Sequence, residues 1–379
     1  MQIITPVPVS DFDAAVRMLS GGTNVAIYND LGLPSIYVRR DKGLISDVID
    51  GGSEVVHPAF KVNGDEIGAF YIGIYLATVY KGRALSLPLQ DPAASGILPL
   101  DKGDAPHRMV TFDNAKIWCE ANGAGFHLAT ISEYAWLALL SRKNGTMPRG
   151  NTLYGVHNAA QYEKGVAADS STDGTQTTRT LTGSGPATWN DNWKPDGICD
   201  LNGNVKEWMG GFRLVDGELQ IFQDNDAAMQ YAQNADSTLW KAILPDGTLT
   251  APGTSGSLKW DYDIDPGTTS GDVAFSLSDS LQYQQDNTTA YGAKRFQSLT
   301  AKDGIIIPER LKALALMPAD SGDHGNNLIY MRNVGESLGL HGGDYTMEDT
   351  AGIFHIDVRR ERNYHTSSVG FRPAFIPGI

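Results

Sequence analysis

Residues 197–208 read GICDLNGNVKEW, a short run rich in oxygen-bearing side chains. The spacing of Asp200, Asn202, Asn204 and Glu207 allows their oxygens to surround a hard cation such as Ca²⁺. The EF-hand pattern is not met, because the loop lacks a glycine at the sixth position. Alternatively, these side chains hold a tight turn through local hydrogen bonds. The residues alone leave a structural calcium site and a hydrogen-bonded turn as the two interpretations.

Two further segments carry motif-like patterns. Residues 128–136 read LATISEYAW, and the C-terminal part combines HGGDY at residues 341–345 with GFR at residues 370–372. Together with GICDLNGNVKEW, they resemble the signatures of the formylglycine-generating, sulfatase-modifying enzymes and their C-type-lectin-like relatives, in the same order along the chain. Lys206 stands where the family has a tryptophan. The resemblance implies an α+β protein with a C-type lectin-like fold of the formylglycine-generating-enzyme type.

The enzymatic chemistry of that family does not carry over to this chain. The family's catalytic cysteine pair lies between the Gly-Gly turn and the final Gly-Phe-Arg, and residues 342–372 contain no cysteine. Met347 and Gly352 cannot replace a thiol nucleophile, because neither forms a thiolate. The chain has two cysteines, Cys119 and Cys199, and the sequence does not decide whether they pair. We therefore predict a binding protein on this scaffold and not an enzyme, with no required cofactor.

The composition indicates a turn-rich protein and disfavours several classes of function. The chain has 379 residues, 42 of them glycine, and is long enough for one large domain or two ordinary ones. Its 30 Lys and Arg against 44 Asp and Glu give a net charge of −14, which disfavours nucleic acid as a partner, because phosphate backbones are bound by basic surfaces. No secretory signal pattern opens the sequence, and the longest uncharged apolar stretch, residues 67–80, is shorter than the roughly 20 residues of a membrane span. We expect no insertion into a membrane.

Local patterns predict a hairpin followed by two helices. The hairpin comprises residues 70–80 and 83–88, on either side of a Lys-Gly turn. Apolar side chains at helical spacing predict the first helix at residues 112–121. The second helix is predicted to begin with Ser132 as its N-cap and to end at residues 142–145, where cations lie at the negative end of the helix dipole. Both helices have the apolar stripe of elements that pack on a sheet.

The C-terminal segment has the pattern of a half-buried strand followed by a polar loop. In residues 354–359 the even positions are apolar and the odd positions are polar, which predicts a strand with one polar, exposed side. Residues 360–368 contain no aliphatic side chain, and residues 369–376 form a second apolar run. With Ala-Gly at residues 351–352, this frame resembles the variable region of proteins diversified by diversity-generating retroelements, particularly phage and prophage receptor-binding proteins.

That resemblance implies that exposed positions of the frame vary and bind ligand. The mutagenesis replaces template Asn codons by codons that end in a pyrimidine, which cannot encode Lys, Gln, Glu, Met or Trp, so Met347, Glu348 and Glu361 are expected to be fixed. Tyrosine and arginine would supply contact area and directional donors, and Ser, Thr and Asn would supply adaptable hydrogen bonds. The positions assigned to the hypervariable ligand-binding face are Tyr345, Thr346, His355, Asp357, Arg359, Arg360, Asn363, Tyr364, His365, Thr366, Ser367 and Ser368.

The expected organisation is a small β-rich attachment region at residues 1–56 followed by the C-type lectin-like domain at residues 57–379. Apolar residues that alternate on both sides of a turn predict a hairpin at residues 25–38 of the first region. Within the second, short patterns between Asp, Gly, Ser and Thr turns predict a long polar insertion at about residues 212–327. The variable region is expected at about residues 340–372.

The sequence therefore predicts a ligand-displaying, receptor-binding protein for host adhesion on a phage or prophage tail. It would be made in the host cytoplasm, act outside the cell on the virion, bind a host surface protein or glycan, and join another particle component through its N-terminal region. This arrangement is compatible with a homo-oligomer. Two alternatives stay open: an enzyme on the same scaffold, such as an oxidase of the formylglycine type, and a calcium-dependent sugar-binding module, although the Glu-Pro-Asn or Gln-Pro-Asp triplet of such lectins is missing.

Overall fold

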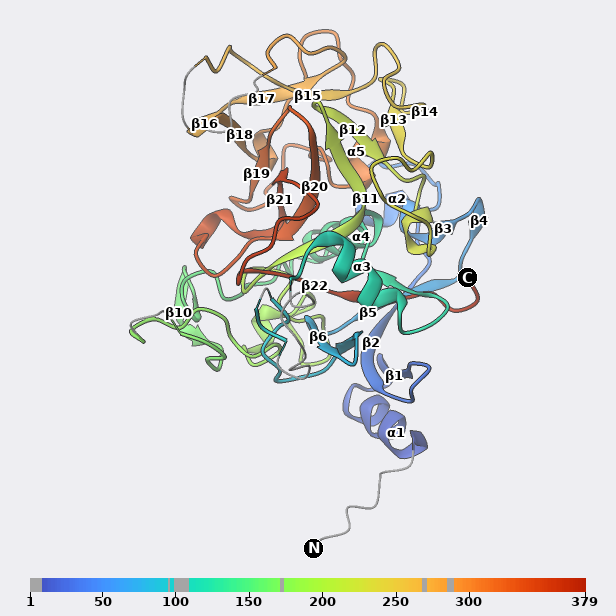
Figure 1. Ribbon diagram of the computed structural model, residues 1–379, viewed down its shortest axis with the longest axis vertical. Coiled ribbons are helices and arrows are strands. Elements are labelled where there is room, and N and C mark those ends of the chain that lie inside the picture. The colour runs from blue at the N-terminus through green and yellow to red at the C-terminus, as the bar shows by residue number, and fades with distance from the viewer. Residues whose placement is uncertain (1–8, 95, 99–108, 171–173, 268–270, 285–289) are drawn as a thin grey trace, which may run out of the picture.

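Short strands dominate the architecture, and helices are few (Figure 1). The computed structural model describes residues 9–94, 96–98, 109–170, 174–267, 271–284 and 290–379. The α-helices are α1 (Val9–Leu19), α2 (Ile45–Val48), α3 (Phe112–Glu120), α4 (Ile131–Lys143) and α5 (Glu309–Ala313). Short 3₁₀ turns lie at Pro58–Phe60, Ala187–Trp189, Asp226–Ala228, Phe296–Ser298 and Glu348–Thr350. The α+β class predicted from the sequence is confirmed. No helix in the described ranges is both long and apolar enough to cross a membrane.

A five-stranded sheet brings the two ends of the chain together. Its strands lie in the order β1 (Asn24–Tyr28), β2 (Pro34–Asp41), β5 (Ala69–Gly73), β23 (Pro373–Phe375) and β8 (Phe126–Leu128). The predicted N-terminal hairpin is present as the antiparallel pair of β1 and β2. Because β2 also pairs with β5, the expected boundary at residue 56 divides one sheet, and residues 24–41 belong to the main fold. Residues 1–8 of the expected attachment region lie outside the described residues.

A twelve-stranded sheet occupies most of the C-terminal half. Its main path runs through β14 (Leu249–Thr250), β13 (Lys241–Ile243), β12 (Glu218–Ile221), β11 (Lys206–Val215), β20 (Glu336–Gly342), β21 (Gly352–Arg360), β19 (Leu328–Met331), β18 (Ala290–Arg295) and β16 (Gly271–Val273). Three strands lie off this path: β15 (Lys259–Tyr262), β17 (Phe275–Ser278) and β22 (Val369–Phe371). Three small pairs complete the described strands: β3 (Lys61–Val62) with β4 (Asp65–Glu66), β6 (Ala77–Tyr80) with β7 (Arg83–Ser86), and β9 (Val156–His157) with β10 (Ala160–Lys164).

The segment expected as a polar insertion, residues 212–327, is a structural part of the large sheet. Strands β12 to β18 lie within it, and the side chains of Trp240, Trp260 and Phe275 are fully buried. The segment is therefore not polar throughout, and its assignment as an insertion in the domain stays a prediction. Each short strand contributes only a few large apolar side chains between polar turns, so the average polarity of the segment conceals its core.

Both predicted helices are present, and the start of the second differs from the prediction. The N-cap of α4 is Thr130, whose hydroxyl accepts the N–H of Glu133 while the Glu133 carboxylate accepts the N–H of Thr130. This reciprocal pair is a capping box. Ser132, the predicted N-cap, lies in the first turn and is buried. The predicted hairpin over residues 70–88 is confirmed for β6 and β7, whereas its first part, β5, joins the five-stranded sheet.

The main core places the C-terminal strand in the interior. Helix α4 is buried almost all round and packs against β11 and β21. Strand β21 lies between β20 and β19 in the large sheet. Its apolar side chains Phe354, Ile356 and Val358 belong to the same core cluster as Leu137 of α4. The polar side of β21 therefore lies in a closely packed region. The residues around it determine whether its polar side chains are exposed and able to bind a ligand.

Candidate functional site: the C-terminal face

His355 and Asp357, two of the polar residues assigned to an exposed face, are fully buried in β21. Their expected exposure was wrong. Strands β19 and β20 flank β21 on both sides, and the charged side chains of Lys206 in β11 and of Arg359 in β21 itself lie against Asp357. A simple alternation of polar and apolar residues cannot distinguish an exposed polar side from one that is covered by oppositely charged groups.

Asp357 is the centre of a buried charge cluster. Its two carboxylate oxygens accept hydrogen bonds of 2.8 Å from Nε and Nη2 of Arg359. The Nζ of Lys206 lies 3.9 Å from Asp357 and 3.1 Å from Asp344. Burial alone would raise the pKa of Asp357, but the hydrogen bonds and charge of Arg359, with the charge of Lys206, hold that pKa well below its usual range. Lys206, the residue that departs from the family signature, therefore lies near two buried carboxylates, and Arg359 supplies the second positive charge of the cluster.

Two tyrosines that the sequence analysis did not select support Arg359. The guanidinium carbon of Arg359 lies 4.0 Å from the ring centre of Tyr330 and 4.6 Å from that of Tyr291. These residues lie in β19 and β18, more than 25 positions before Arg359 in the chain, and only the order of strands brings them to β21. No local pattern identifies them. A second arginine–tyrosine contact is local, because Arg360 lies 4.4 Å from the ring centre of Tyr364.

Ten of the twelve assigned residues retain some exposure and lie on two loops and the end of β21. Thr346, Asn363 and Ser367 are exposed, and the others are half-buried. The two loops are in contact, because Tyr345 and Ser367 share a side-chain hydrogen bond. We define the C-terminal face as Tyr345, Thr346, Arg359, Arg360, Asn363, Tyr364, His365, Thr366, Ser367 and Ser368.

The three motifs quoted from the sequence meet beneath this face. Arg372 of the GFR motif is fully buried and donates hydrogen bonds of 2.9 and 3.0 Å to the two carboxylate oxygens of Glu207. The hydroxyl of Tyr134 in α4 donates to Glu207 over 2.5 Å. Arg372 also donates to the carbonyl oxygens of Gly73 and Ile74. This network joins both sheets and α4, and provides a rigid base for the loops.

The four side chains considered as calcium ligands do not converge on a common centre. Their hydrogen-bond partners are Thr182 and Gly183 for Asp200, the carbonyl of Pro148 for Asn202, the main chain of Thr180 for Asn204, and Arg372 with Tyr134 for Glu207. In the ranges that the structure describes, no group of three or more His, Cys, Asp and Glu could hold a metal ion. The side chains do serve as hydrogen-bonding groups, but each of these partners lies 17 or more positions away in the chain, so they join distant segments and do not hold a local turn as the alternative expected.

Cys119 and Cys199 are both free and buried. Burial raises the pKa of each thiol well above its ordinary value, and nearby carboxylates act in the same direction. Each thiol is therefore held in its protonated form and away from solvent, which is unfavourable for a nucleophile. The cysteines do not pair, and neither lies at the C-terminal face.

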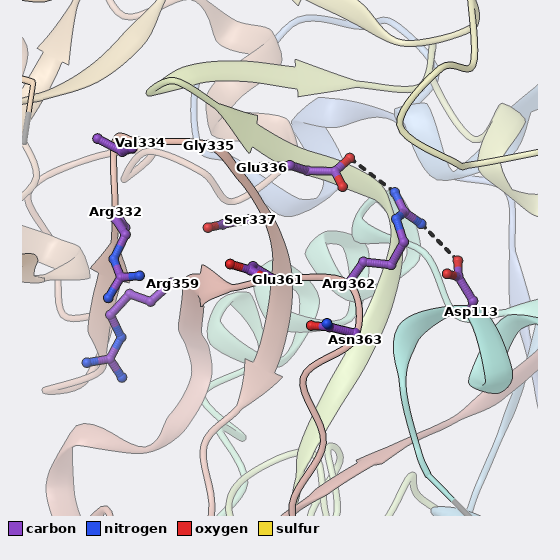
Figure 2. Close-up of a pocket in the computed structure, with 10 residues that line it drawn as sticks. All are labelled: Asp113, Arg332, Val334, Gly335, Glu336, Ser337, Arg359, Glu361, Arg362 and Asn363. Atoms are coloured by element: carbon purple, nitrogen blue, oxygen red, sulfur yellow. Dashed lines mark hydrogen bonds and ion pairs between the residues drawn. The ribbon is translucent and has the colours of Figure 1, made fainter. Parts of the chain in front are cut away.

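A cavity of about 380 Å³ opens beside the C-terminal face (Figure 2). Arg359 and Asn363 of the face line it, together with Arg332, Ser337 and Glu361. Figure 2 shows a second side of the cavity that is closed by Arg362, paired with Asp113 and Glu336 at 2.9 and 3.1 Å. Of these residues, only Arg359 and Asn363 were predicted from the sequence to bind ligand. Arg332 and Ser337 precede the expected variable region, and Glu361 was expected to be fixed.

Comparison with known proteins gives only weak likenesses. No family profile matches the sequence, and no curated protein matches it. Among solved structures, the chain is similar to the Major Tropism Determinant U1 Variant, with 13% identity, a TM-score of 0.33, and coverage of 93% of this chain and 72% of that chain. It is also similar to Treponema denticola variable protein 1, with 13% identity, a TM-score of 0.28, and coverage of 93% and 99%. TM-scores this low do not establish a common fold.

Proposed function

We propose that this chain is a ligand-displaying, receptor-binding protein of a phage or prophage tail, built on a C-type lectin-like fold. Its C-terminal face would bind a protein or glycan of the host cell surface. The observation that carries the proposal is the sharp change of environment within one short segment: residues 352–358 are fully buried, and residues 359–368 are exposed or half-buried on loops above a rigid base.

The side chains of the face suit recognition. Tyr345 and Tyr364 offer large, amphipathic rings with few rotatable bonds, and Arg359 and Arg360 offer directional donors. The intervening Ser, Thr, Asn and His side chains adapt their hydrogen bonds to different partners. Substitution of exposed side chains typically changes stability by no more than ~0.5 kcal/mol, so such a surface tolerates the variation that the retroelement resemblance implies.

In this proposal the N-terminal helix attaches the protein to the particle. Helix α1 lies at one end of the molecule (Figure 1), and its side chains Met18 and Leu19 are 78% and 85% exposed. Adjacent exposed apolar side chains are typical of a surface that another protein covers. The partner would be another tail component or a further copy of this chain.

The enzymatic alternative has less support from the site. An oxidase of the formylglycine type needs reactive thiols, and this chain has no cysteine between residues 342 and 372. Its two cysteines are buried with raised pKa values. No observation on the described residues favours the calcium-dependent sugar-binding module over the present proposal.

The test measures binding of the fluorescently labelled chain to bacterial cells by flow cytometry, with strains related to the one that carries the gene. The face variant combines Tyr345→Ser, Arg360→Ala and Asn363→Ala, and so removes a tyrosine ring and an arginine donor as well as a polar loop side chain. We expect the wild type to label at least one strain and the variant to bind it at least about tenfold more weakly, because a few central side chains provide most of the affinity of an interface.

A matched control variant carries Asn63→Ala, Asp65→Ala and Glu66→Ala in the exposed loop and strand of β3 and β4. It should label cells as strongly as the wild type. Equal labelling by the wild type and the face variant would assign adhesion to another surface and overturn the proposal. Circular dichroism and thermal unfolding of each variant confirm that the fold is retained.

A further inference from the structure

A second cavity, of about 240 Å³, is formed by segments that are far apart in the chain. The turn that carries Asn202, the loop at residues 325–327 and the 3₁₀ turn Glu348–Thr350 all contribute to its wall. The segments at residues 147–149 and 157–159 complete the described lining. The described residues that line it all lie outside the C-terminal face. This cavity is therefore a candidate binding site separate from that face.

One polar atom of the residues in this wall has no hydrogen-bond partner. Asn202 is 7% exposed, and its amide nitrogen donates to the carbonyl oxygen of Pro148 over 2.8 Å. That contact fixes the orientation of the amide, because a flipped amide would set two acceptors against each other. The amide oxygen, Oδ1, is buried and accepts no hydrogen bond from the described residues. A buried acceptor without a partner costs free energy, so a ligand that donates a hydrogen bond to it is favoured.

Two of the charged side chains in the wall are offset by ion pairs. Arg149 lies 2.6 Å from Glu163, and Asp349 lies 3.6 Å from Arg295. Each pair has one positive and one negative member, so together they contribute no net charge to the cavity.

Glu348 is the charged residue of the wall that remains. Its side chain is exposed and forms no ion pair within the described ranges, while its main-chain N–H donates to the carbonyl oxygen of Thr152 over 2.9 Å. Burial and the charge of Arg149 lower the pKa of His157, so this ring is neutral near pH 7. The cavity therefore has a net negative charge, which favours a cationic ligand.

The rest of the wall is largely apolar. It consists of the side chains of Met147, Pro148, Ala159, Ala351 and Ile353. Three further amide side chains in the wall already bond to the protein: Asn158 to Thr152, Asn326 to Asp349, and Asn327 to Ala351 and Phe354. An alkyl chain fits an apolar wall, whereas the ring hydroxyls of a sugar would lose their hydrogen bonds with water against it.

We propose that this cavity binds the side chain of a lysine on a partner protein, with its ammonium group on Asn202 and Glu348 and its alkyl stem along the apolar wall. An ammonium group has three donors, and the amide oxygen with the two carboxylate oxygens provides three acceptors. The guanidinium group of arginine has five donors and would leave some of them without a partner. The volume is below the roughly 300 Å³ at which pockets for whole small molecules begin, which suits a single side chain. The site would hold a protein partner independently of the C-terminal face.

The experiment titrates the full chain with the peptide acetyl-Gly-Lys-Gly-amide and measures its affinity by saturation-transfer NMR. A peptide with trimethyllysine keeps the positive charge but has no N–H donor on the side chain. A peptide with norleucine keeps the alkyl stem and loses both the charge and the donors. We expect the lysine peptide to bind at least about tenfold more tightly than either, because a hydrogen bond to a charged group typically contributes that much affinity.

The variant Glu348→Gln tests the charge of the cavity. It keeps the length of an exposed side chain and should weaken binding of the lysine peptide by about tenfold. The matched control Glu54→Gln changes the total charge of the chain by the same amount at another exposed position and should leave this binding unchanged. An equal loss in both variants would mean that the overall charge of −14 attracts the peptide, and would overturn the inference.

Three further outcomes would also contradict it: equal affinities for the three peptides, wild-type affinity in Glu348→Gln, or glucosamine binding as tight as that of the lysine peptide. The last result would indicate an amino sugar as the ligand. The proposed function is tested separately by cell labelling. If the chain labels cells through the C-terminal face but binds no lysine peptide, only this inference fails. If it binds the lysine peptide but substitutions in the C-terminal face leave labelling intact, the proposed function fails and the lysine site stands.

Discussion

Strand segment Gly352–Val358 and loop segment 361–368 are separated by only two residues, yet they lie in opposite environments. The first is buried along its whole length between β19 and β20. The second leaves the sheet, and its side chains are exposed or half-buried. Both segments contain polar residues, so polarity does not distinguish them. In the strand, Asp357 is held by Arg359 of the same strand and by Lys206 of β11, and His355 is enclosed by the sheet. In the loop most side chains are at least partly exposed to solvent, although Arg362 is paired with Asp113 and Glu336.

Substitution in the base beneath the face should have the largest effect. Arg372→Gln leaves the carboxylate of Glu207 buried without its cation and removes donors to several carbonyl groups. We expect a loss of about 3–5 kcal/mol in the free energy of unfolding, because breaking a fully buried ion pair leaves the remaining charge buried without a partner. Urea unfolding measures this loss. The matched control Arg360→Gln, on the face, should cost no more than about 1 kcal/mol. Equal losses in both variants would contradict the distinction between base and face.

Acid should destabilise the buried sheet around β21 through His355 of β21 and His341 of β20. Burial lowers the pKa of His355 to about 4 and that of His341 to about 3, and the charges of Lys206 on His355 and of His355 on His341 add to this. In the unfolded chain these side chains titrate near ~6.5. Between about pH 4 and 6.5 the unfolded state therefore binds more protons, so stability rises with pH and is lost as pH falls through this window. For His355 alone the loss approaches about 3 kcal/mol.

The variant His355→Leu isolates this contribution. Neither ring nitrogen of His355 has a hydrogen-bond partner in the described part of the chain, so leucine leaves no partner unsatisfied. We expect its unfolding free energy, measured in urea from pH 4.5 to 7.5, to depend less steeply on pH than that of the wild type. Asn363→Leu, which changes an exposed loop side chain and removes no titratable group, should keep the wild-type slope. A His355→Leu variant with the wild-type slope would show that this histidine does not cause the pH dependence.

The smallest effects on stability are expected on the loop itself. Asn363→Ala removes an exposed side chain and should change the free energy of unfolding by no more than ~0.5 kcal/mol. Asn204→Ala makes the same change at a fully buried site and removes hydrogen bonds to the main chain of Thr180, so it should cost about 1–3 kcal/mol. Thermal and urea unfolding of the pair provide the comparison. A large loss at Asn363 would mean that the loop is part of the structural frame and cannot vary freely.

Prediction from sequence succeeded where the signal is local. The helical spacing around Trp118 predicted α3, the N-cap signal and the cations at residues 142–143 predicted α4, and the Lys-Gly turn predicted the hairpin of β6 and β7. It failed for the N-cap of α4, because Ser132 and Thr130 are both good N-cap residues and only the backbone geometry selects Thr130. The exposed loop 361–368 was also predicted correctly, since it contains no aliphatic residue.

Local sequence thus specifies helices α3 and α4, the hairpins of β1–β2 and β6–β7, and the polar loop of the C-terminal face, because each depends on neighbours within a few residues. It did not predict α1, α2 or α5, and residues 1–56 were expected to be β-rich although they contain α1 and α2. Tertiary structure alone decided that His355 and Asp357 are buried, that Lys206 lies near two carboxylates, and that Tyr291 and Tyr330 support Arg359. These outcomes depend on the order and register of strands that are far apart in the chain. An alternating pattern shows which side chains share one side of a strand, but the packed neighbours determine whether that side meets solvent, charge or ligand.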